Sequence, residues 1–316
     1  MSPKAINLNK PKVLVLLGPT AVGKTALGVR LAWKYQGEIV SADSRQVYQG
    51  MDIGTGKDLA EYKVGRKHIP YHLIDVISPN TEFNLAQYQK LALEAISDII
   101  NRGQLPIIVG GTGLYLQALV DNYDLSKISP DLEKRRELEA LTKDELFGRL
   151  KKLKPEFALK LNNSDKNNPR RLVRYLEIVE KDGDLSNKQD SPCDFLVLGL
   201  DFPDDILRER INKRIKNRLE KEDMLSEVER LHNSGVSWER LISFGLEYKF
   251  LSYYLLGRLD YDEMVQKLGD ASYRFAKRQK TWFKRWERQG RKIHWLRGQS
   301  EAEVLSEAEV LIDNYL

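Results

Sequence analysis

The sequence predicts an α/β fold, with a parallel-sheet core, an inserted helical domain and a helical C-terminal part. Three observations predict this fold class. A glycine-rich loop at 18–25 follows an apolar strand-like run, strand-like and helix-like segments alternate as far as about residue 120, and a highly charged helical stretch then interrupts them. Strands that alternate with helices form parallel sheets with right-handed crossovers.

The first 120 residues supply most of the expected core. Asn84 is a suitable cap for one of its helices, and Gly103 a suitable stop. In parallel sheets, ligands bind beyond the carboxyl ends of the strands. We therefore expect the 18–25 loop, Asp43 and residues 110–113 around one crevice. The expected elements are strands at 13–17, 38–41 and 106–109, and helices at 24–35, 84–101 and 114–120.

The rest of the chain is predicted to be mainly helical. From 124 to 183 the pattern is helical and charged, a β-like run at 195–202 returns to the sheet, and the chain then reads as helical nearly to its end. We therefore divide the chain into three parts. These are the first part of the core (10–123), an inserted helical region (124–192), and the completion of the core with basic C-terminal helices (193–316).

The distribution of charge along the chain indicates what kind of partner the protein binds. The formal net charge is +5, but residues 273–297 hold ten Lys/Arg and a single acidic residue, so this segment carries +9 and the remainder −4. A basic segment on a slightly acidic protein indicates a polyanionic partner. No apolar run has the length of a membrane helix, and the lone Cys193 can form no internal disulfide. We expect a cytoplasmic protein without membrane association, and a monomer.

The 18–25 loop fits the phosphate-loop pattern G-x-x-x-x-G-K-[ST] at every fixed position. Its backbone N–H groups and the following helix N-terminus favour phosphate oxygens. Lys24 adds a positive charge, and the Thr25 hydroxyl is a candidate Mg²⁺ ligand. The core is therefore predicted to be P-loop NTPase-like. The expected phosphate-binding residues are Gly18, Pro19, Thr20, Ala21, Val22, Gly23, Lys24 and Thr25.

The acidic residue expected of an NTPase is missing from its usual place. A Walker-B aspartate normally ends an apolar strand and holds Mg²⁺, yet the strand at 106–109 runs into Gly110-Gly111-Thr112-Gly113. Asp43 is the other candidate, but the polar run 43–46 combines a base with several hydrogen-bonding groups. This mixture suits a second substrate better than a metal site, which weakens the triphosphate interpretation.

Five segments together resemble the tRNA dimethylallyltransferase (tRNA isopentenyl transferase) family, in its order and at its spacing. They extend from about residue 12 to residue 297. The first motif is shared by many proteins, whereas its combination with the second and third is highly specific. The segments are LGPTAVGKT, SADSRQVYQGMDIGTGK, PIIVGGTGLYLQALV, NNPRRLVRYLE and FAKRQKTW.

The resemblance implies transfer of a dimethylallyl group from dimethylallyl diphosphate to the exocyclic amine of the adenosine 3′ of a tRNA anticodon. Asp43 would then be the base that takes the amine proton. Lys24 and Arg214 would stabilise the departing diphosphate, with Thr20 at the reacting centre. Arg210 and Arg218 share a helical stripe with Arg214, but a solvated helix face explains them equally well.

The tRNA side rests on physical clues as well as on the resemblance. Asn168-Pro169 predicts a helix start, and three arginines crowd its first turn, where the helix dipole disfavours cations. They indicate an anionic partner, with pairing to nearby acids as the alternative. The basic segment also contains six aromatic residues, which together could stack on the bases of an RNA loop. Each of them taken singly is better explained as a core residue of a helix. The residues expected to contact tRNA are Ser44, Arg45, Gln46, Thr112, Arg171, Arg174, Gly245, Lys277, Arg278 and Gln279.

The sequence departs from the family pattern outside the proposed catalytic residues. In the segment 243–247, only Gly245 matches the family pattern, and MLSEV stands where the family has a longer element. The chain also has too few cysteines for the zinc finger of eukaryotic relatives. Two alternatives stay open: prenylation of free AMP, ADP or ATP, and a P-loop kinase or NTP-dependent nucleic-acid-binding protein. The first needs no basic aromatic surface, and the second requires phosphate release from ATP.

Overall fold

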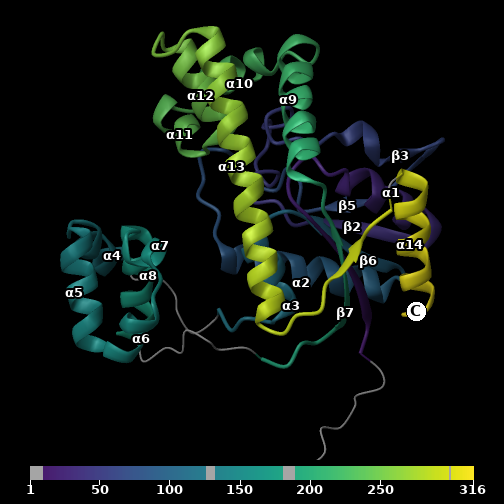
Figure 1. The fold of residues 1–316 in the computed structure, drawn as a ribbon, viewed down its shortest axis with the longest axis horizontal. Helices are drawn as coiled ribbons and strands as arrows, with labels where there is room; N and C mark the ends of the chain where they lie inside the picture. Colours follow the sequence, from purple (N-terminus) through teal and green to yellow (C-terminus); the bar gives the residue numbers. More distant parts are fainter. Residues whose placement is uncertain (1–9, 126–131, 181–188, 299) are drawn as a thin grey trace, which may run out of the picture. The chain divides into compact units, whose positions relative to one another are not determined.

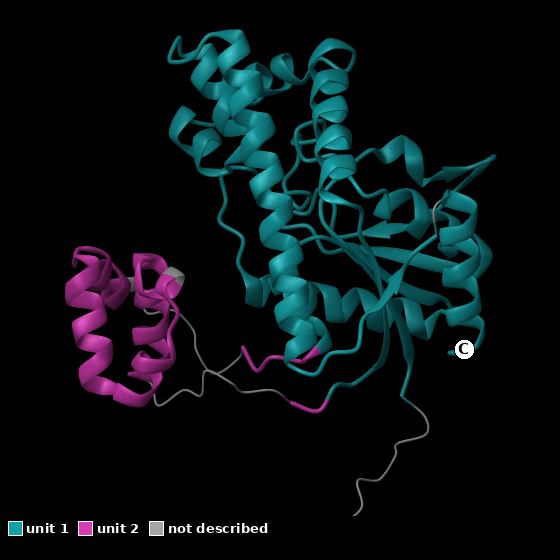
Figure 2. Cartoon of the chain, in the orientation of Figure 1, with its two compact units in different colours: residues 1–120, 191–316 teal, residues 121–190 magenta. Residues whose placement is uncertain are grey.

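A computed structural model describes residues 10–125, 132–180, 189–298 and 300–316. The chain forms two compact units, one from residues 1–120 and 191–316 and the other from residues 121–190 (Figure 2). The second unit is thus an insertion in the sequence of the first. Of the helical stretch expected at 124–183, residues 126–131 and 181–183 lie outside the described residues.

The larger unit contains a six-stranded parallel sheet with the order β5-β2-β6-β1-β7-β8 (Figure 1). The central strand β1 pairs with β6 on one side and β7 on the other. Its apolar run is buried almost throughout, as expected for a strand covered on both faces. The strands are β1 (Lys12–Leu17), β2 (Gly37–Ser41), β5 (Tyr71–His72), β6 (Leu105–Gly110), β7 (Asp194–Leu200) and β8 (His294–Leu296).

Alternate side chains of β1 enter different hydrophobic cores. Leu14 and Leu16 share a cluster with the apolar face of α1, whereas Val13 and Val15 share one with α2 and α3. The sheet is therefore a layer between two sets of helices. These three helices are α1 (Lys24–Lys34), α2 (Leu85–Asn101) and α3 (Gly113–Val120).

A group of helices extends from the C-terminal half of the same unit. Figure 1 shows α9 and α13 running from the sheet towards the cluster of α10, α11 and α12. Helix α13 contacts α3, α9 and α12. The helices of this group are α9 (Asp204–Glu220), α10 (Met224–Asn233), α11 (Trp238–Ser243), α12 (Leu246–Leu255) and α13 (Tyr261–Arg288). The last helix, α14 (Glu301–Asp313), contacts α1 and β8 instead.

Short elements lie between β2 and α2. A 3₁₀ turn, η1 (Leu59–Tyr62), precedes a two-stranded antiparallel ribbon of β3 (Lys63–Val64) and β4 (Lys67–His68). None of the helices that the structure describes is long and apolar enough to span a membrane.

The smaller unit is helical and has its own core. Leu146, Leu150, Leu172 and Leu176 are fully buried in it, because they recur at helical spacing on α5 and α8. Its helices are α4 (Leu132–Glu139), α5 (Lys143–Leu153), α6 (Pro155–Lys160), α7 (Asn163–Lys166) and α8 (Pro169–Val179).

Most expected elements are confirmed to within one or two residues. Asn84 caps α2 with a reciprocal capping box, and Asn168 caps α8 with proline at its first position. The expectation that the chain is helical from about residue 203 nearly to its end is wrong at β8, whose three residues pair with β7. Phe283 and Trp286 of the basic segment are core residues.

Candidate active site

The 18–25 loop connects the end of β1 to the start of α1. Gly18 must be glycine because a Cβ there would lie 2.4 Å from the carbonyl oxygen of Leu200. Gly23 precedes α1 with φ 86°, in the left-handed region that favours glycine. These two glycines allow the backbone to turn tightly between the strand and the helix N-terminus, as the motif predicts.

Lys24 places a buried amine with a lowered pKa in this loop. Its Nζ donates a hydrogen bond to the carbonyl oxygen of Pro19 at 2.7 Å. Burial lowers the pKa of Lys24 to about 8, Asp43 opposes the shift, and Arg214 adds to it. A bound phosphate would raise the pKa of Lys24, because an opposite charge favours the ionised form.

This environment predicts a pH dependence for the diphosphate binding that is expected of the loop. Lys24 is mostly charged below its pKa of about 8 and mostly neutral above it, so affinity should fall as pH rises. The loss should approach about tenfold per pH unit well above that pKa. Calorimetric titration with dimethylallyl diphosphate from about pH 7 to about pH 9.5 measures this change. The Lys24→Met variant should lack the decrease, and an equal decrease in both proteins would contradict the assignment.

Asp43 directly follows the end of β2 in a fixed turn. One of its carboxylate oxygens accepts the backbone N–H of Arg45 at 2.9 Å. The turn after β6 holds the same segment, because Thr112 Oγ1 accepts the Ser44 N–H at 3.0 Å and the Thr112 N–H bonds to the Ala42 carbonyl. The β2 and β6 ends are thus joined beside the candidate base.

Arg45 and Gln46 are engaged within the protein. Arg45 forms a 2.7 Å ion pair with the buried Glu247 of α12. Burial opposes ionisation of Glu247, but Arg45 and Arg214 lower its pKa overall. Gln46 accepts the Ser41 hydroxyl and donates to the Gly56 carbonyl, both at 2.8 Å. These contacts fix the side chains of two residues that we expected from the sequence to contact tRNA.

The arginine stripe of α9 faces the same region. Arg214 Nη2 donates to Thr20 Oγ1 at 2.8 Å, whereas its buried Nε has no partner among the described residues. Burial and then Arg218 lower the pKa of Arg214 to about 10. Arg210 is exposed, with its Nε bonded to the Ala21 carbonyl at 2.9 Å. An unpaired donor in this position suits an anionic ligand.

Arg218 contradicts the interpretation of the stripe as a solvated face. Its side chain is only 3% exposed, and its Nη2 lies 3.4 Å from Asp58. The neighbouring Gly56 leaves room for it, because a Cβ there would lie 2.3 Å from Arg218 Nη2. Arg218 therefore supports the 55–58 segment.

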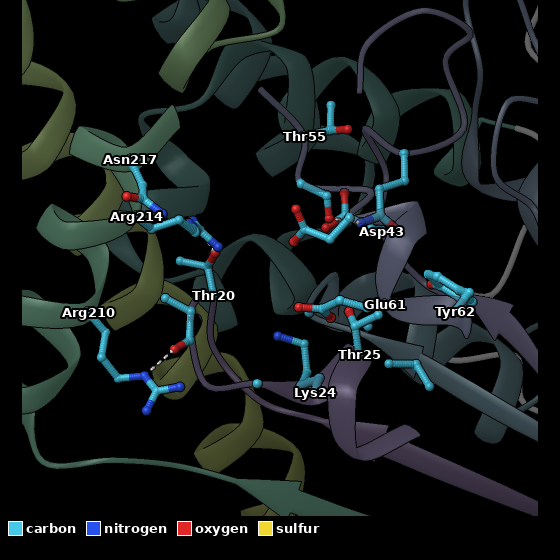
Figure 3. A pocket seen from close by; sticks show the side chains of 18 of the residues that line it. Thr20, Lys24, Thr25, Asp43, Thr55, Glu61, Tyr62, Arg210, Arg214 and Asn217 are labelled. Carbon is cyan, nitrogen blue, oxygen red and sulfur yellow. Dashed lines mark hydrogen bonds between the residues drawn. The ribbon is translucent and has the colours of Figure 1, made fainter. Parts of the chain in front are cut away.

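One cavity of about 480 Å³ joins these groups at the carboxyl ends of the strands (Figure 3). Lys24, Arg210, Lys213 and Arg214 provide its positive side chains. Its acids are Asp43, Asp58 and Glu61, and burial and then Asp58 raise the pKa of Glu61. The lining residues are Thr20, Ala21, Gly23, Lys24, Thr25, Asp43, Gln46, Thr55, Gly56, Asp58, Glu61, Tyr62, Val109, Gly110, Gly111, Arg210, Lys213, Arg214 and Asn217.

The segment from Thr55 to Tyr62 was not assigned a role from sequence. One buried charge holds the turn just before this segment, and a second lies within the segment. Glu227 accepts the backbone N–H groups of residues 52–54 at 2.6–2.9 Å. Lys57 is 1% exposed and pairs with Asp52 at 2.6 Å and with Asp75. The sequence did contain a signal for this wall of the cavity. Its first residues belong to DIGTGK (52–57), the end of the family motif SADSRQVYQGMDIGTGK.

The other residues expected to contact tRNA lie outside the cavity lining. Lys277 forms an ion pair with Asp204, Arg278 is exposed, and Gly245 precedes α12 with φ 73°. In the smaller unit, Arg171 pairs with Asp165 at 2.5 Å and Arg174 with Glu177 at 3.1 Å.

The oxygen donors around Thr25 are chemically suited to Mg²⁺. The Thr25 hydroxyl shares the cavity with three carboxylates, while the described residues contain no preformed group of three or more His, Cys, Asp or Glu. Mg²⁺ commonly uses one or two protein ligands and completes its shell with substrate phosphates and waters. The site therefore fits an ion that is bound together with a diphosphate.

The fold and the cavity define the chain as a protein of P-loop-like fold with a charged cavity at the carboxyl ends of its strands. A family model described as IPP transferase matches residues 46–286. The chain is 46% identical over 300 residues to tRNA dimethylallyltransferase 1 of Geotalea uraniireducens (strain Rf4), which covers 95% of this chain and 96% of the relative. It therefore belongs to the tRNA dimethylallyltransferase family.

Solved structures agree with this assignment. A full-length tRNA isopentenylpyrophosphate transferase from Bacillus halodurans superposes with a TM-score of 0.69 at 35% identity, covering 96% of each chain. A eukaryotic dimethylallyltransferase, described as acting on tRNA, superposes with a TM-score of 0.77 at 26% identity, covering 96% of this chain and 79% of that one. The resemblance found in the sequence motifs is confirmed.

Proposed function

We propose that the protein transfers a dimethylallyl group from dimethylallyl diphosphate to the exocyclic amine of the adenosine 3′ of a tRNA anticodon, releasing diphosphate. The observation that carries the proposal is the cavity, in which the carboxylate of Asp43 accompanies the 18–25 loop, Lys24 and Arg214. A carboxylate and several cations in one cavity suit proton removal and the departure of a phosphate group.

The reaction replaces one bond with another. The amine nitrogen forms a bond to C1 of the dimethylallyl group, the bond from C1 to the diphosphate oxygen breaks, and its electron pair leaves with the diphosphate. The amine gives up one proton, which Asp43 accepts. An aromatic amine is a weak nucleophile, so a base placed beside it lowers the barrier as the C–N bond forms.

The cations stabilise the leaving group. Charge develops on the bridging oxygen in the transition state, so cations that are already in place bind that state more tightly than the substrate. Lys24 and Arg214 provide this charge, and the donation of Arg214 to Thr20 Oγ1 places the Thr20 side chain beside it. When bound, Mg²⁺ on Thr25 would neutralise part of the diphosphate charge.

A tRNA acceptor is supported by the family and by the basic surfaces of the chain. The tRNA dimethylallyltransferase of Geotalea uraniireducens and the tRNA isopentenylpyrophosphate transferase of Bacillus halodurans match nearly the whole chain. The exposed side of α13 carries basic residues such as Arg274, Arg278 and Lys284, and phosphate contacts of this type position nucleic acids. A free nucleotide acceptor would not require such a surface.

One labelling experiment tests the proposal against its alternatives. The protein is incubated with labelled dimethylallyl diphosphate and either bulk tRNA or AMP, ADP or ATP. Label in tRNA is expected. Label in a free nucleotide but not in tRNA would identify an adenylate prenyltransferase. Phosphate release from ATP without any prenyl transfer would identify a P-loop kinase or NTPase.

Arg171 provides a test of the tRNA surface of the smaller unit. Arg171→Ala should weaken tRNA binding and lower the slope of log K against log salt by about one unit, because one phosphate contact is lost. Filter binding over a salt series measures this slope. Lys151→Ala, which removes an exposed cation of α5 in the same unit, is the matched control. An unchanged slope with lowered thermal stability would mean that Arg171 serves only its ion pair with Asp165.

A further inference from the structure

Gln279 lies on the inner face of α13, in a stretch that is otherwise strongly basic. It is 7% exposed, and Phe283, four residues later on the same face, is fully buried. The neighbouring Arg278 is exposed instead. Arg278 and Gln279 therefore face different environments, although the basic run 277–279 as a whole suggests contact with RNA.

The carboxamide of Gln279 joins two loops of the candidate active site. Its Oε1 accepts the backbone N–H of Thr20 at 2.9 Å, and its Nε2 donates to the carbonyl oxygen of Gly111 at 2.8 Å. The reversed amide would place donor against donor and acceptor against acceptor, so the two backbone partners fix this orientation.

The packing leaves little freedom at this contact. A Cβ on Gly111 would lie 2.4 Å from Gln279 Nε2, and a Cβ on Gly113 would lie 2.3 Å from Cδ1 of Trp282. The turn after β6 is therefore in direct contact with α13. The bond to Gly111 thus acts on a segment that is already closely packed.

Both ends of the bridge lead to groups that the proposed reaction uses. On one side, Thr20 is held by its N–H through Gln279 and by its hydroxyl through Arg214. On the other side, Gly111 precedes Thr112, which bonds to the Ala42 carbonyl and the Ser44 N–H on either side of Asp43.

We propose that Gln279 is a positioning residue, whose carboxamide sets the 18–25 loop and the Asp43 segment in register for transfer. This inference rests on the proposed function. It assigns Gln279 to the chemical step, and leaves the exposed residues of α13 for RNA contact.

Two near-isosteric variants test it. Gln279→Met keeps most of the volume and removes both hydrogen bonds, so kcat should fall by about 100-fold, as expected when reacting groups are displaced by about 1 Å. The KM values for tRNA and dimethylallyl diphosphate should be retained. Wild-type kcat in this variant, or a loss confined to the KM for tRNA, would overturn the proposal.

Gln279→Glu provides the sharper measurement. As a carboxylate it accepts from Thr20 but cannot donate to Gly111, whereas as a neutral acid it can do both. Burial favours the neutral acid, so the ratio of variant to wild-type kcat should rise towards one as pH falls. A ratio that does not change with pH would overturn the proposal, and this variant retains the test if Gln279→Met fails to fold.

The wild-type protein is the reference at every pH. The charged groups near this part of α13 include Lys24 and Asp43 in the cavity, Arg214, which bonds to Thr20, and Lys280, which pairs with Asp201 and Asp204. They are present in both proteins, so the ratio of the two kcat values reports the change at residue 279. Melting temperatures confirm that each variant is folded during the assay. Absence of transfer by the wild type would refute the proposed function, whereas wild-type transfer with an unaffected Gln279→Met variant would refute only this inference.

Discussion

Replacing Asp43 with alanine is expected to lower kcat for prenyl transfer to tRNA by about 10²–10⁴-fold, the range for loss of a general base. Binding of dimethylallyl diphosphate should be largely retained, because the 18–25 loop, Lys24 and Arg214 remain. Single-turnover kinetics with labelled donor, together with calorimetric titration of the donor, separate these two quantities.

Asp43→Asn is the matched variant. Its side-chain oxygen can still accept the N–H of Arg45, the contact that Asp43 makes at 2.9 Å, but the amide cannot take a proton at neutral pH. Both variants should therefore lose kcat to a similar extent. Loss of donor binding in both variants would instead identify Asp43 as a metal ligand. Recovery of kcat in Asp43→Asn would identify a role in shaping the turn.

The core was predictable because its signals are local. The apolar run of β1 and the 18–25 loop occupy consecutive positions, and the capping residue Asn84 stands directly before α2. Parallel sheets bring the carboxyl ends of their strands to one edge. This rule places Asp43 and the Gly110 turn beside the loop, as the lining of the cavity shows.

Short edge elements were missed because their signal is weak. Strand β5 has two residues and β8 has three, too few to show a period in the sequence. Their pairing with β2 and β7 depends on the sheet that is already present. Tertiary context, not local preference, determines such strands.

Burial of polar side chains was the main information that the sequence lacked. Arg218 and Gln279 both lie on helices rich in charge, where a solvated or RNA-facing position is the natural interpretation. Arg218 is buried against Asp58 and Gly56, from a loop about 160 residues earlier. Gln279 is buried against two loops that are also far away in sequence. A buried polar group needs partners, and distant segments supply them here.

Replacing Arg214 with glutamine is expected to lower kcat by about 10²–10³-fold, the usual loss when one preorganised donor to a developing negative charge is removed. Glutamine can keep some contact with the Thr20 hydroxyl but carries no charge for the leaving diphosphate. Arg210→Gln is the matched control, one helical turn earlier, because its exposed guanidinium bonds to the Ala21 carbonyl and not to Thr20. Its effect should be much smaller. Rates measured with saturating tRNA and donor test the difference, and equal losses in the two variants would mean that Arg214 contributes only to the general positive charge of the cavity.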